Sequence, residues 1–379
     1  MPASTQTAVP CILMRGGTSR GPFFREADLP ADIATRDRVL LAVMGSPDAR
    51  QINGLGGAHP LTSKVGIVRP GREPGVDLDF LFAQLQPARD TVDTTPNCGN
   101  MLAAVVPFAL ETGMVAPRGE TSTFRVLTLN TGMAADITVR TPGGAVEYEG
   151  EARIDGAPGT AAPVDIAFLD TAGSVCSGLL PTGRVRDTIA VEGEGFAPFS
   201  VDVTCIDNGM PLVIFHAAAL GRTGYESVAD LNADTELKTK VEALRLKAAL
   251  AMGLGDVSAA NYPKMTLIAP PRAGGAISTR SFIPHVCHDA IGVLAAVTVA
   301  TACVLPGSVC EGLATVPESL TPTVSVEHPT GEFSVTLERD AEDPTRVHKA
   351  ALLRTARALM RGEALVPRSV WDGAGTAGA

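Results

Sequence analysis

A cysteine lies where a polar loop gives way to an apolar stretch. The loop is Thr94-Thr95-Pro96-Asn97-Cys98-Gly99-Asn100, and the apolar stretch covers residues 101–110. This pattern predicts Cys98 in the first turn of a buried helix, where free N–H groups and the helix dipole stabilise a thiolate or a bound carboxylate. Such a thiol is a nucleophile or a proton carrier. The alternative is a small buried apolar side chain, as most free cysteines are.

A lysine enters an apolar strand from a glycine-rich loop. The loop covers residues 51–60, and Lys64 precedes Val65-Gly66-Ile67-Val68. Burial disfavours the ammonium form of a lysine, so Lys64 is a candidate general base. The alternative is a lysine whose stem lies along the end of a strand while its amine stays in water.

A third polar cluster follows the first strand, which we expect over residues 9–14. It is the turn Arg15-Gly16-Gly17-Thr18-Ser19-Arg20-Gly21. Paired glycines let backbone amides face a ligand, and Arg15 and Ser19 add a cation and a hydroxyl, which favours an anion site. The alternative is an ordinary hairpin turn. The turn does not match the phosphate-binding pattern GxxxxGK[ST].

Length and composition limit the elements that position these groups. The 379 residues suit two domains, which we expect at 1–184 and 185–379, because 156–184 is rich in Gly, Pro and Ala. We expect helices over 29–45, 234–252 and 289–305. Three strands of a meander are expected over 123–130, 135–140 and 145–149.

The net charge of −10 and the lack of a basic stripe exclude a nucleic-acid binder. An acidic protein binds an acidic ligand only by gathering its few cations in one pocket. The seven cysteines show no CxxC and no zinc-type spacing, so we expect neither a disulfide framework nor a metal.

The N-terminus shows no secretory signal pattern. The apolar helix expected over 289–305 is interrupted by Thr298 and Thr301, which favours a core helix over a membrane span. We therefore expect a cytoplasmic protein with no membrane or nucleic-acid partner. A homodimer is compatible with the sequence, which does not fix the oligomeric state.

The second half of the chain repeats the first. The strand and turn over 201–209 match the opening strand and turn, and Met252-Gly253 ends a helix as Met44-Gly45 does. The run 263–270 matches 63–70, lysine for lysine and proline for proline. His285-Val286-Cys287-His288-Asp289 precedes a long apolar run, as Asn97-Cys98-Gly99-Asn100 does. Four matches in the same order indicate a duplicated unit.

Duplication predicts an active site in a cleft between two similar lobes. Two helix starts, one with Cys98 and one with Cys287 or His288, would meet there, and Lys64 and Lys264 would enter from opposite sides. Such a cationic site suits a di- or tricarboxylate that loses and regains a proton. The candidate site residues beyond Lys64 and Cys98 are therefore Arg15, Ser19, Asn97, Gly99, Asn100, Lys264 and His288.

Several longer motifs resemble the PrpF/aconitate-isomerase family over most of the chain. They are Met14-Arg15-Gly16-Gly17-Thr18-Ser19, Met44-Gly45-Ser46-Pro47-Asp48, Gln51-Ile52-Asn53-Gly54-Leu55-Gly56-Gly57, Thr62-Ser63-Lys64 and Asn97-Cys98-Gly99-Asn100. Other details, Asp48-Ala49-Arg50-Gln51 among them, are most similar to the 4-oxalomesaconate tautomerases and isomerases within it.

The resemblance implies an α+β protein with the diaminopimelate-epimerase fold, two pseudo-symmetric lobes that each wrap a sheet around a central helix. It also implies a cofactor-independent isomerase that moves a proton in a small unsaturated polycarboxylate, with the catalytic lysine and cysteine at Lys64 and Cys98. Arg20 departs from the family, whose members usually carry lysine there. Which of Cys287 and His288 faces the cleft stays open.

Three alternatives follow from the same residues. The first is a 1,3-allylic isomerase of a related substrate, and the second is a carboxylate-binding accessory protein without catalysis. The third is an amino-acid epimerase, which the cationic residues disfavour because its substrate carries an ammonium group.

Overall fold

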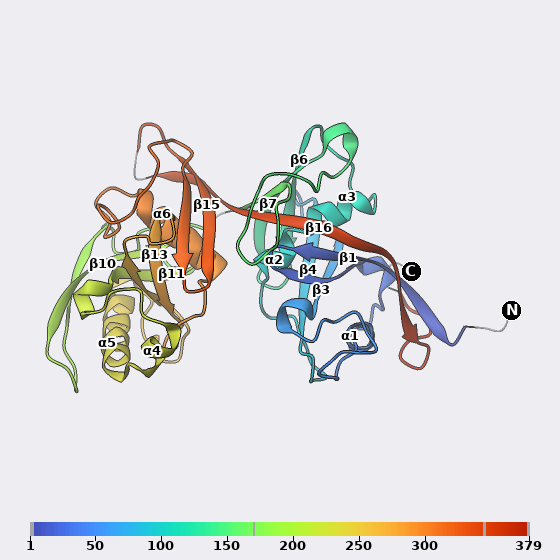
Figure 1. Ribbon diagram of the computed structural model, residues 1–379, viewed down its shortest axis with the longest axis horizontal. Helices are drawn as coiled ribbons and strands as arrows, with labels where there is room; N and C mark the ends of the chain where they lie inside the picture. Colours follow the sequence, from blue (N-terminus) through green and yellow to red (C-terminus); the bar gives the residue numbers. More distant parts are fainter. Residues whose placement is uncertain (1–3, 170, 344–345, 377–379) are drawn as a thin grey trace. The chain divides into compact units, whose positions relative to one another are not determined.

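The computed structural model describes residues 4–169, 171–343 and 346–376 (Figure 1). The chain divides into two compact units. Unit 1 comprises Met1–Ala167 and Arg354–Ala379, and unit 2 comprises Phe168–Leu353.

Unit 1 is built from strands and short helices. Its strands are β1 (Gln6–Gly16), β2 (Ser19–Arg25), β3 (Lys64–Pro70), β4 (Leu78–Leu85), β5 (Val92–Asp93), β6 (Thr121–Thr128), β7 (Met133–Arg140) and β8 (Pro163–Phe168). Its helices are α1 (Ile33–Met44), α2 (Gly99–Leu102) and α3 (Val105–Glu111), with single 3₁₀ turns at Glu26–Asp28, Pro60–Thr62 and Pro142–Gly144.

The sheet of unit 1 curves around α2 and α3. Its strand order is β1-β2-β3-β4-β6-β7-β8, and α2 contacts β1 and β2 while α3 contacts β3 and β7. Phe23 of β2 connects the layers, because its ring centroid lies 5.7 Å from that of Phe108 in α3 and 6.4 Å from that of Phe80 in β4. Helix α1 covers the opposite face, where Val65 and Ile67 join its apolar cluster.

Unit 2 has longer helices. Its strands are β9 (Asp187–Val191), β10 (Phe199–Asp207), β11 (Pro211–His216), β12 (Lys264–Ala269), β13 (Ile277–Phe282), β14 (Thr323–His328) and β15 (Gly331–Arg339). Its helices are α4 (Val228–Ala233), α5 (Thr235–Ala251) and α6 (Val293–Val304), with a 3₁₀ turn at Ala217–Leu220.

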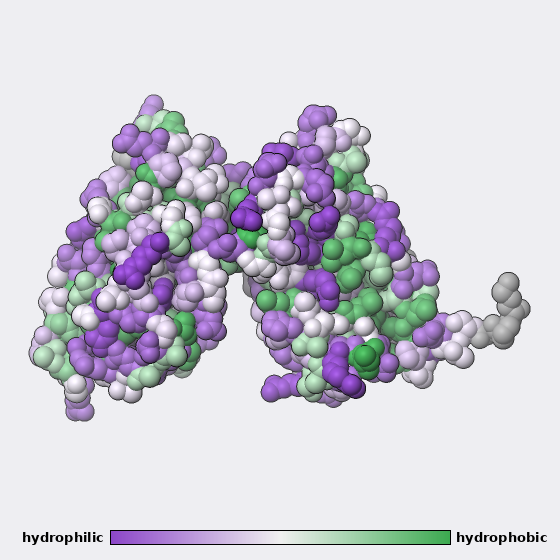
Figure 2. All heavy atoms as spheres, viewed as in Figure 1, coloured by the Kyte–Doolittle hydropathy of each residue, from purple (hydrophilic) through white to green (hydrophobic). Residues whose placement is uncertain are grey.

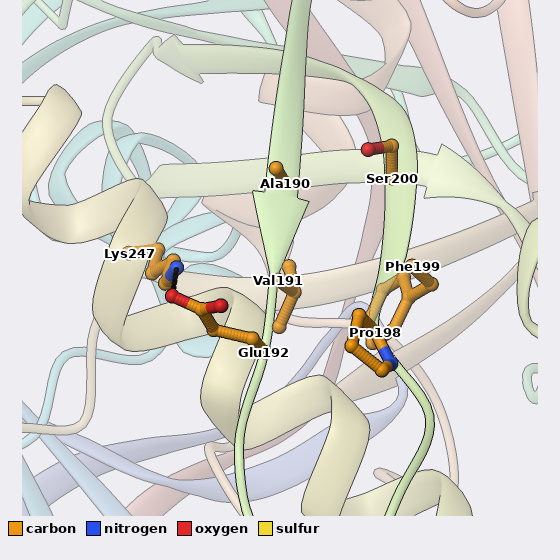
Figure 3. Close-up of a pocket in the computed structure, with 7 residues that line it drawn as sticks. All are labelled: Ala190, Val191, Glu192, Pro198, Phe199, Ser200 and Lys247. Atoms are coloured by element: carbon orange, nitrogen blue, oxygen red, sulfur yellow. Dashed lines mark ion pairs between the residues drawn. The ribbon is translucent and has the colours of Figure 1, made fainter.

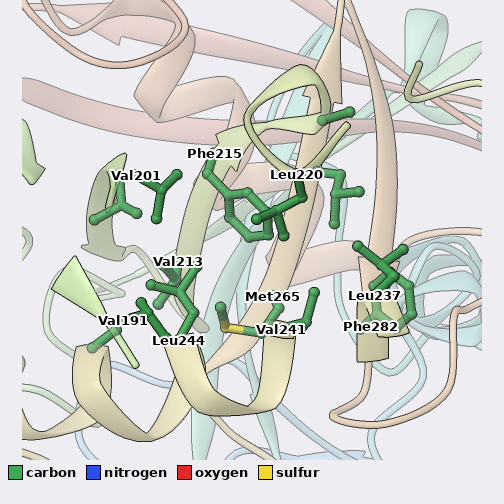
Figure 4. Close-up of a cluster of buried hydrophobic side chains, with 14 of the residues drawn as sticks. Val191, Val201, Val213, Phe215, Leu220, Leu237, Val241, Leu244, Met265 and Phe282 are labelled. Atoms are coloured by element: carbon green, nitrogen blue, oxygen red, sulfur yellow. The ribbon is translucent and has the colours of Figure 1, made fainter. Parts of the chain in front are cut away.

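The sheet of unit 2 lies between α5 and α6. Its order is β9-β10-β11-β12-β13-β14-β15, and α6 contacts β10, β11, β14 and β15. On the other face, Leu237, Val241 and Leu244 of α5 pack against Phe215 and Met265 (Figure 4). Residues alternate between the faces along each strand, so this cluster and the α6 layer share the same strands.

The two units repeat one topology, as the sequence matches predicted. In each, a hairpin (β1–β2 and β10–β11) is followed by one or two helices and then by a strand parallel to the second hairpin strand. An antiparallel strand and the central helix come next. A further antiparallel pair completes each sheet. The predicted α+β class, with a sheet around a central helix in each half, is confirmed.

The units differ from the expected ranges at two places. The expected boundary at residue 184 lies inside unit 2, because β8 forms within the Gly- and Pro-rich stretch and unit 2 begins at Phe168. The chain end belongs to unit 1 because strand β16 (Val347–Pro367) is 21 residues long. Its first part pairs with β15 and its last part pairs with β1.

Two local predictions need correction. The apolar run after Cys98 forms two helices rather than one, because Pro107 has no N–H to bond the carbonyl of Ala103 and the chain turns there. Residues 145–149 form no strand. They follow Gly143 and Gly144, which have φ of 61° and 84°, and the backbone bonds that they donate are the turn bond of Ala145 to Pro142 and the bond of Glu147 to Arg140.

The apolar helix at 289–305 is confirmed as a core helix, but it begins at Val293, and nine of its residues are buried. Within the described residues, no helix is both long and apolar enough to cross a membrane. On the face in Figure 2, hydrophilic residues cover much of both units, and hydrophobic residues gather over unit 1. Exposed apolar side chains of β16 include Leu359, Met360 and Leu365.

Candidate active site

Lys64 is the first residue of β3, and the close approach of β2 fixes its backbone. A Cβ atom on Gly21 would lie 1.8 Å from the carbonyl oxygen of Lys64, so only glycine lets the two strands meet there. Val65 and Ile67 face α1, so Lys64 points to the other face, toward α2. The side chain is 9% exposed, and its Nζ lies 5.1 Å from the ring centroid of Phe82.

Cys98 contacts the amine of Lys64 from the N-terminal end of α2. It is the N-cap residue of α2, in an extended conformation, and it is 8% exposed. The Nζ of Lys64 donates a hydrogen bond to its Sγ over 3.4 Å. An amine and a thiol are therefore in direct contact, although they lie 34 positions apart in the chain.

The residues on either side of Cys98 have different roles. Asn97 supports the loop: its Nδ2 donates to the hydroxyls of Thr128 and Thr131, and its Oδ1 accepts from the N–H of Cys98. Gly99 begins α2. Asn100 donates from Nδ2 to the hydroxyl of Thr18, while its buried Oδ1 has no hydrogen-bond partner among the described residues.

The glycine turn packs on the start of α2. A Cβ atom on Gly17, which has a φ of 53°, would lie 2.2 Å from Oδ1 of Asn100. Ser19 is 1% exposed, and its hydroxyl has no partner within the part of the chain that the structure describes. A buried hydroxyl without a partner costs free energy unless a ligand or water satisfies it. Ser19 therefore has the character of a binding residue.

Arg15 forms hydrogen bonds within unit 1. Its Nη1 donates to the carbonyl oxygens of Gly17 and Thr355 and to the hydroxyl of Thr355. Burial, together with the charge of Arg357, lowers the pKa of Arg15. The sequence predicted an anion-binding arginine here, which stays a prediction; Nη1 is engaged with Gly17 and Thr355.

In unit 2, Lys264 and His288 lie near each other. Lys264 is the first residue of β12 and is half-buried, and burial lowers its pKa. Burial also lowers the pKa of His288, and the charge of Lys264 lowers it further. The Nδ1 of His288 accepts a hydrogen bond from the N–H of Ala290 over 2.8 Å.

Cys287 does not open the central helix, which corrects the prediction made from the repeat. Residues 283–288 turn back onto β13, where Cys287 pairs with Phe282 and the N–H of His288 donates to the carbonyl of Ser281. The N–H of Cys287 is held by the side chain of Asn232 over 2.7 Å. Burial raises the pKa of the Cys287 thiol to about 11. The N-cap of α6 is Gly292.

Gln51 is a residue that the sequence interpretation missed. It is 1% exposed although polar, and its φ of 49° is rare for a residue with a side chain. Its Oε1 accepts from the N–H of Ala58 and the hydroxyl of Ser63, and its Nε2 donates to Ser46. Ser63 directly precedes Lys64, so Gln51 fixes the loop that delivers the lysine. A glutamine among the glycines of residues 51–57 was the available signal.

A pocket in unit 2 lies apart from these groups. It has a volume of about 310 Å³ beside β9 and β10, and Figure 3 shows the Lys247–Glu192 ion pair in it, with a distance of 3.8 Å. None of the predicted site residues lines this pocket.

Known proteins are similar to this chain over nearly its whole length. Residues 6–367 match the family described as PrpF protein. The "(4E)-oxalomesaconate Delta-isomerase" of Novosphingobium sp. (strain KA1) is 54% identical over 95% of this chain and 98% of its own length. The "4-oxalomesaconate tautomerase" of Pseudomonas putida is 52% identical over 97% of this chain and 99% of its own.

A solved structure is similar as well. The crystal structure of "Methylitaconate-delta-isomerase" aligns with a TM-score of 0.84 and 32% identity over 97% of each chain. The family match spans all of the strands and helices described above, including those that carry Lys64 and Cys98. The chain belongs to the PrpF protein family.

Proposed function

We propose that the protein is a cofactor-independent isomerase that interconverts the keto and enol forms of 4-oxalomesaconate. The observation that carries the proposal is the contact of Lys64 Nζ and Cys98 Sγ over 3.4 Å at a buried helix start. The relative named 4-oxalomesaconate tautomerase, 52% identical over nearly the whole chain, supports the choice of substrate.

In this proposal, Lys64 in its amine form removes a proton from the carbon next to the keto group. The C–H electron pair becomes the new C=C bond, and the carbonyl π pair moves to oxygen, which takes up a proton to become the enol hydroxyl. Cys98 delivers or relays that proton and becomes a thiolate, which then takes a proton from the ammonium group formed at Lys64 over 3.4 Å, so that both groups return to their starting forms. General acid–base catalysis of this kind contributes about 10²- to 10⁴-fold in rate.

The carboxylates need donors that the fold leaves free. We assign one carboxylate contact to the hydroxyl of Ser19, which is buried and has no partner in the described residues. The free atom of Asn100 is Oδ1, which only accepts, so we assign it to a proton-bearing group of the substrate and not to a carboxylate. The backbone N–H of Gly99 lies at the same helix start. Asn97 and the Nη1 of Arg15 are engaged with their own unit, so we give both a supporting role.

A second candidate is a 1,3-allylic isomerase acting on the same carbon skeleton. The relative named (4E)-oxalomesaconate Delta-isomerase, at 54% identity, favours it. The Lys64–Cys98 pair would serve both reactions, since they differ in whether the returning proton goes to oxygen or to the far carbon of the conjugated system. We also propose a cytoplasmic setting, which the seven free cysteines support.

Proton NMR in D₂O tests the proposal. Wild-type protein mixed with 4-oxalomesaconate should exchange the proton next to the keto group and form the enol. Lys64→Met should lose at least about 100-fold of this rate while its melting temperature stays close to wild type. Lys247→Met, which removes a partly exposed lysine of α5, is the matched control and should keep full activity.

Three outcomes would contradict the proposal. Near-normal turnover by Lys64→Met removes the assigned base. A new C–H signal at the far carbon instead of an enol identifies the allylic isomerase. Binding of 4-oxalomesaconate without any deuterium exchange identifies a carboxylate-binding accessory protein.

A further inference from the structure

The repeat places Lys264 and Gly292 where unit 1 has Lys64 and Cys98. Each lysine begins the strand that runs parallel to the second hairpin strand of its unit. Cys98 is the N-cap of the first central helix and Gly292 is the N-cap of α6, and both are extended. Met265 and Leu267 face α5, so Lys264 points toward α6, as Lys64 points toward α2.

Both amines lie beside the N-cap residue of their helix, although the two distances end on different atoms. The Nζ of Lys64 is 3.4 Å from Sγ of Cys98, and the Nζ of Lys264 is 3.4 Å from the point where a Cβ atom on Gly292 would lie. The lysine is therefore retained in the second copy, and the side chain that would face it is missing.

Neither backbone strain nor crowding explains a glycine at this position. Gly292 has a φ of −66°, which every residue adopts. A Cβ atom there would have ordinary contacts, with Lys264 Nζ at 3.4 Å and Ala295 Cβ at 3.9 Å. The missing side chain leaves space directly beside the amine.

Among the described residues, the amine of Lys264 has no bonding partner. It forms no hydrogen bond or ion pair with the residues that the structure describes, whereas Lys64 has the sulfur of Cys98. A half-buried ammonium group without an anion is destabilised, and a ligand carboxylate would supply the missing charge.

We propose that the space beside Gly292 is a carboxylate subsite, in which Lys264 binds one carboxylate of the polycarboxylate substrate and the absence of a side chain at residue 292 keeps the space open. The inference rests on the proposed function for the identity of the substrate.

His288 fits the same subsite as a neutral donor. Burial and the charge of Lys264 hold its pKa below 6.5, against a smaller opposing effect of Asp289. Because Nδ1 accepts from Ala290, the neutral ring carries its proton on Nε2. The cluster thus combines one cation with one neutral donor, which suits a carboxylate better than a phosphate, whose higher charge calls for more cations.

Two variants of the subsite test the inference in the full-length protein. Lys264→Met removes the cation, and Gly292→Asp fills the space with a resident carboxylate. The readouts are the KM for 4-oxalomesaconate and the Kd for tricarballylate, an unreactive tricarboxylate, by calorimetry. Each variant should weaken binding about 10- to 100-fold, as expected for one charged hydrogen bond, with little change in melting temperature.

The controls separate charge from position. Gly362→Asp adds the same charge on exposed β16, where a new side chain meets nothing within 4 Å, and it should bind as wild type does. Gly292→Ala adds only a methyl group and should weaken binding less than Gly292→Asp. In the double variant Lys264→Met/Gly292→Asp, the loss of binding free energy should be smaller than the sum of the two single losses. Both changes disrupt the same ion pair, the one between Lys264 and the ligand carboxylate.

Failure of this inference differs from failure of the proposed function. If wild type converts 4-oxalomesaconate and Lys264→Met keeps its KM and Kd, the subsite is wrong and the function stands. The subsite is also wrong if Gly292→Asp binds as Gly362→Asp does. If wild type binds tricarballylate through Lys264 but exchanges no proton of 4-oxalomesaconate, the subsite stands and the function is wrong.

Discussion

Replacing Gln51 by leucine separates the positioning of Lys64 from its chemistry. The side chain of Gln51 joins Ser46, Ala58 and Ser63 in the loop that ends at the lysine. Leucine has a similar volume and no polar atom, so it removes these three hydrogen bonds while the buried position stays filled. Lys64 and Cys98 remain unchanged.

The expected loss of stability depends on whether each hydrogen-bond partner of Gln51 has a second hydrogen bond. Ser63 also donates to the carbonyl of His59, and Ser46 also donates to that of Gln86, so both hydroxyls stay paired. Only the N–H of Ala58 loses its partner, which costs about 1–3 kcal/mol, and the other two bonds add about 1 kcal/mol together. Gln51→Leu should therefore lower the free energy of unfolding by about 2–4 kcal/mol.

Activity should fall by more than stability explains. Gln51 and Ala58 both have positive φ values, a conformation that persists only while contacts enforce it. Without those contacts the loop relaxes and Ser63 carries Lys64 with it. Because a misplacement of about 1 Å can cost roughly 100-fold in rate, kcat should fall about 10- to 100-fold at a temperature where the variant is folded, with KM changed much less.

Urea unfolding and deuterium-exchange kinetics measure the two effects. Gln51→Glu is the rescue variant, since it keeps two acceptors for Ala58 and Ser63, and it should recover most of kcat. Gln6→Leu, at the exposed start of β1, controls for adding an apolar side chain. The expected loss in unfolding free energy is about 2–4 kcal/mol. A measured loss of less than about 1 kcal/mol would refute the hydrogen-bond reasoning. A destabilised Gln51→Leu with unchanged kcat would refute the positioning role.

Three further predictions follow from single groups. Cys98→Ser should cost about 10²- to 10⁴-fold in deuterium exchange, because a hydroxyl is a far weaker acid than a thiol, and an unchanged rate would remove Cys98 from the proton path. At pH 8, iodoacetamide should leave Cys287 unlabelled by mass spectrometry, because burial raises its pKa to about 11. The pKa of His288 is lowered in the folded state from 6.5, so the unfolded chain binds more protons and stability should fall as pH drops below about 6.5. His288→Gln should flatten this part of the stability profile, and an unchanged profile would contradict the shift.

Local patterns predicted much of the fold because the chain repeats itself. Two lysines, each followed six residues later by proline, marked Lys64 and Lys264 as equivalent, and each begins a strand with the same neighbours. The loop before an apolar run placed Cys98 correctly at a helix start. These features depend on residues within a few positions of one another, which a sequence shows directly.

Tertiary contacts decided the features that the sequence did not show. Cys287 precedes an apolar run just as Cys98 does, but the amide of Asn232, from α4, holds its N–H and turns the chain back onto β13. Gln51 is one polar residue in a loop until Ala58 and Ser63 fold against it. The 3.4 Å contact of Lys64 and Cys98 likewise depends on how β3 packs against the helix layer. No spacing in the sequence carries such information.

The two copies of the unit show why duplication suits a reaction on a charged substrate. A lysine at the start of a parallel strand, facing the start of a helix, needs an anion or must lose its proton. In unit 1 a thiol takes that place, and under our proposal the lysine and the thiol exchange a proton. In unit 2 the same place holds Gly292, so under our proposal the anion must come from the ligand. The loss of one side chain would then turn a proton-transfer pair into a binding site without altering the fold, because the N-cap conformation of Gly292 is open to any residue.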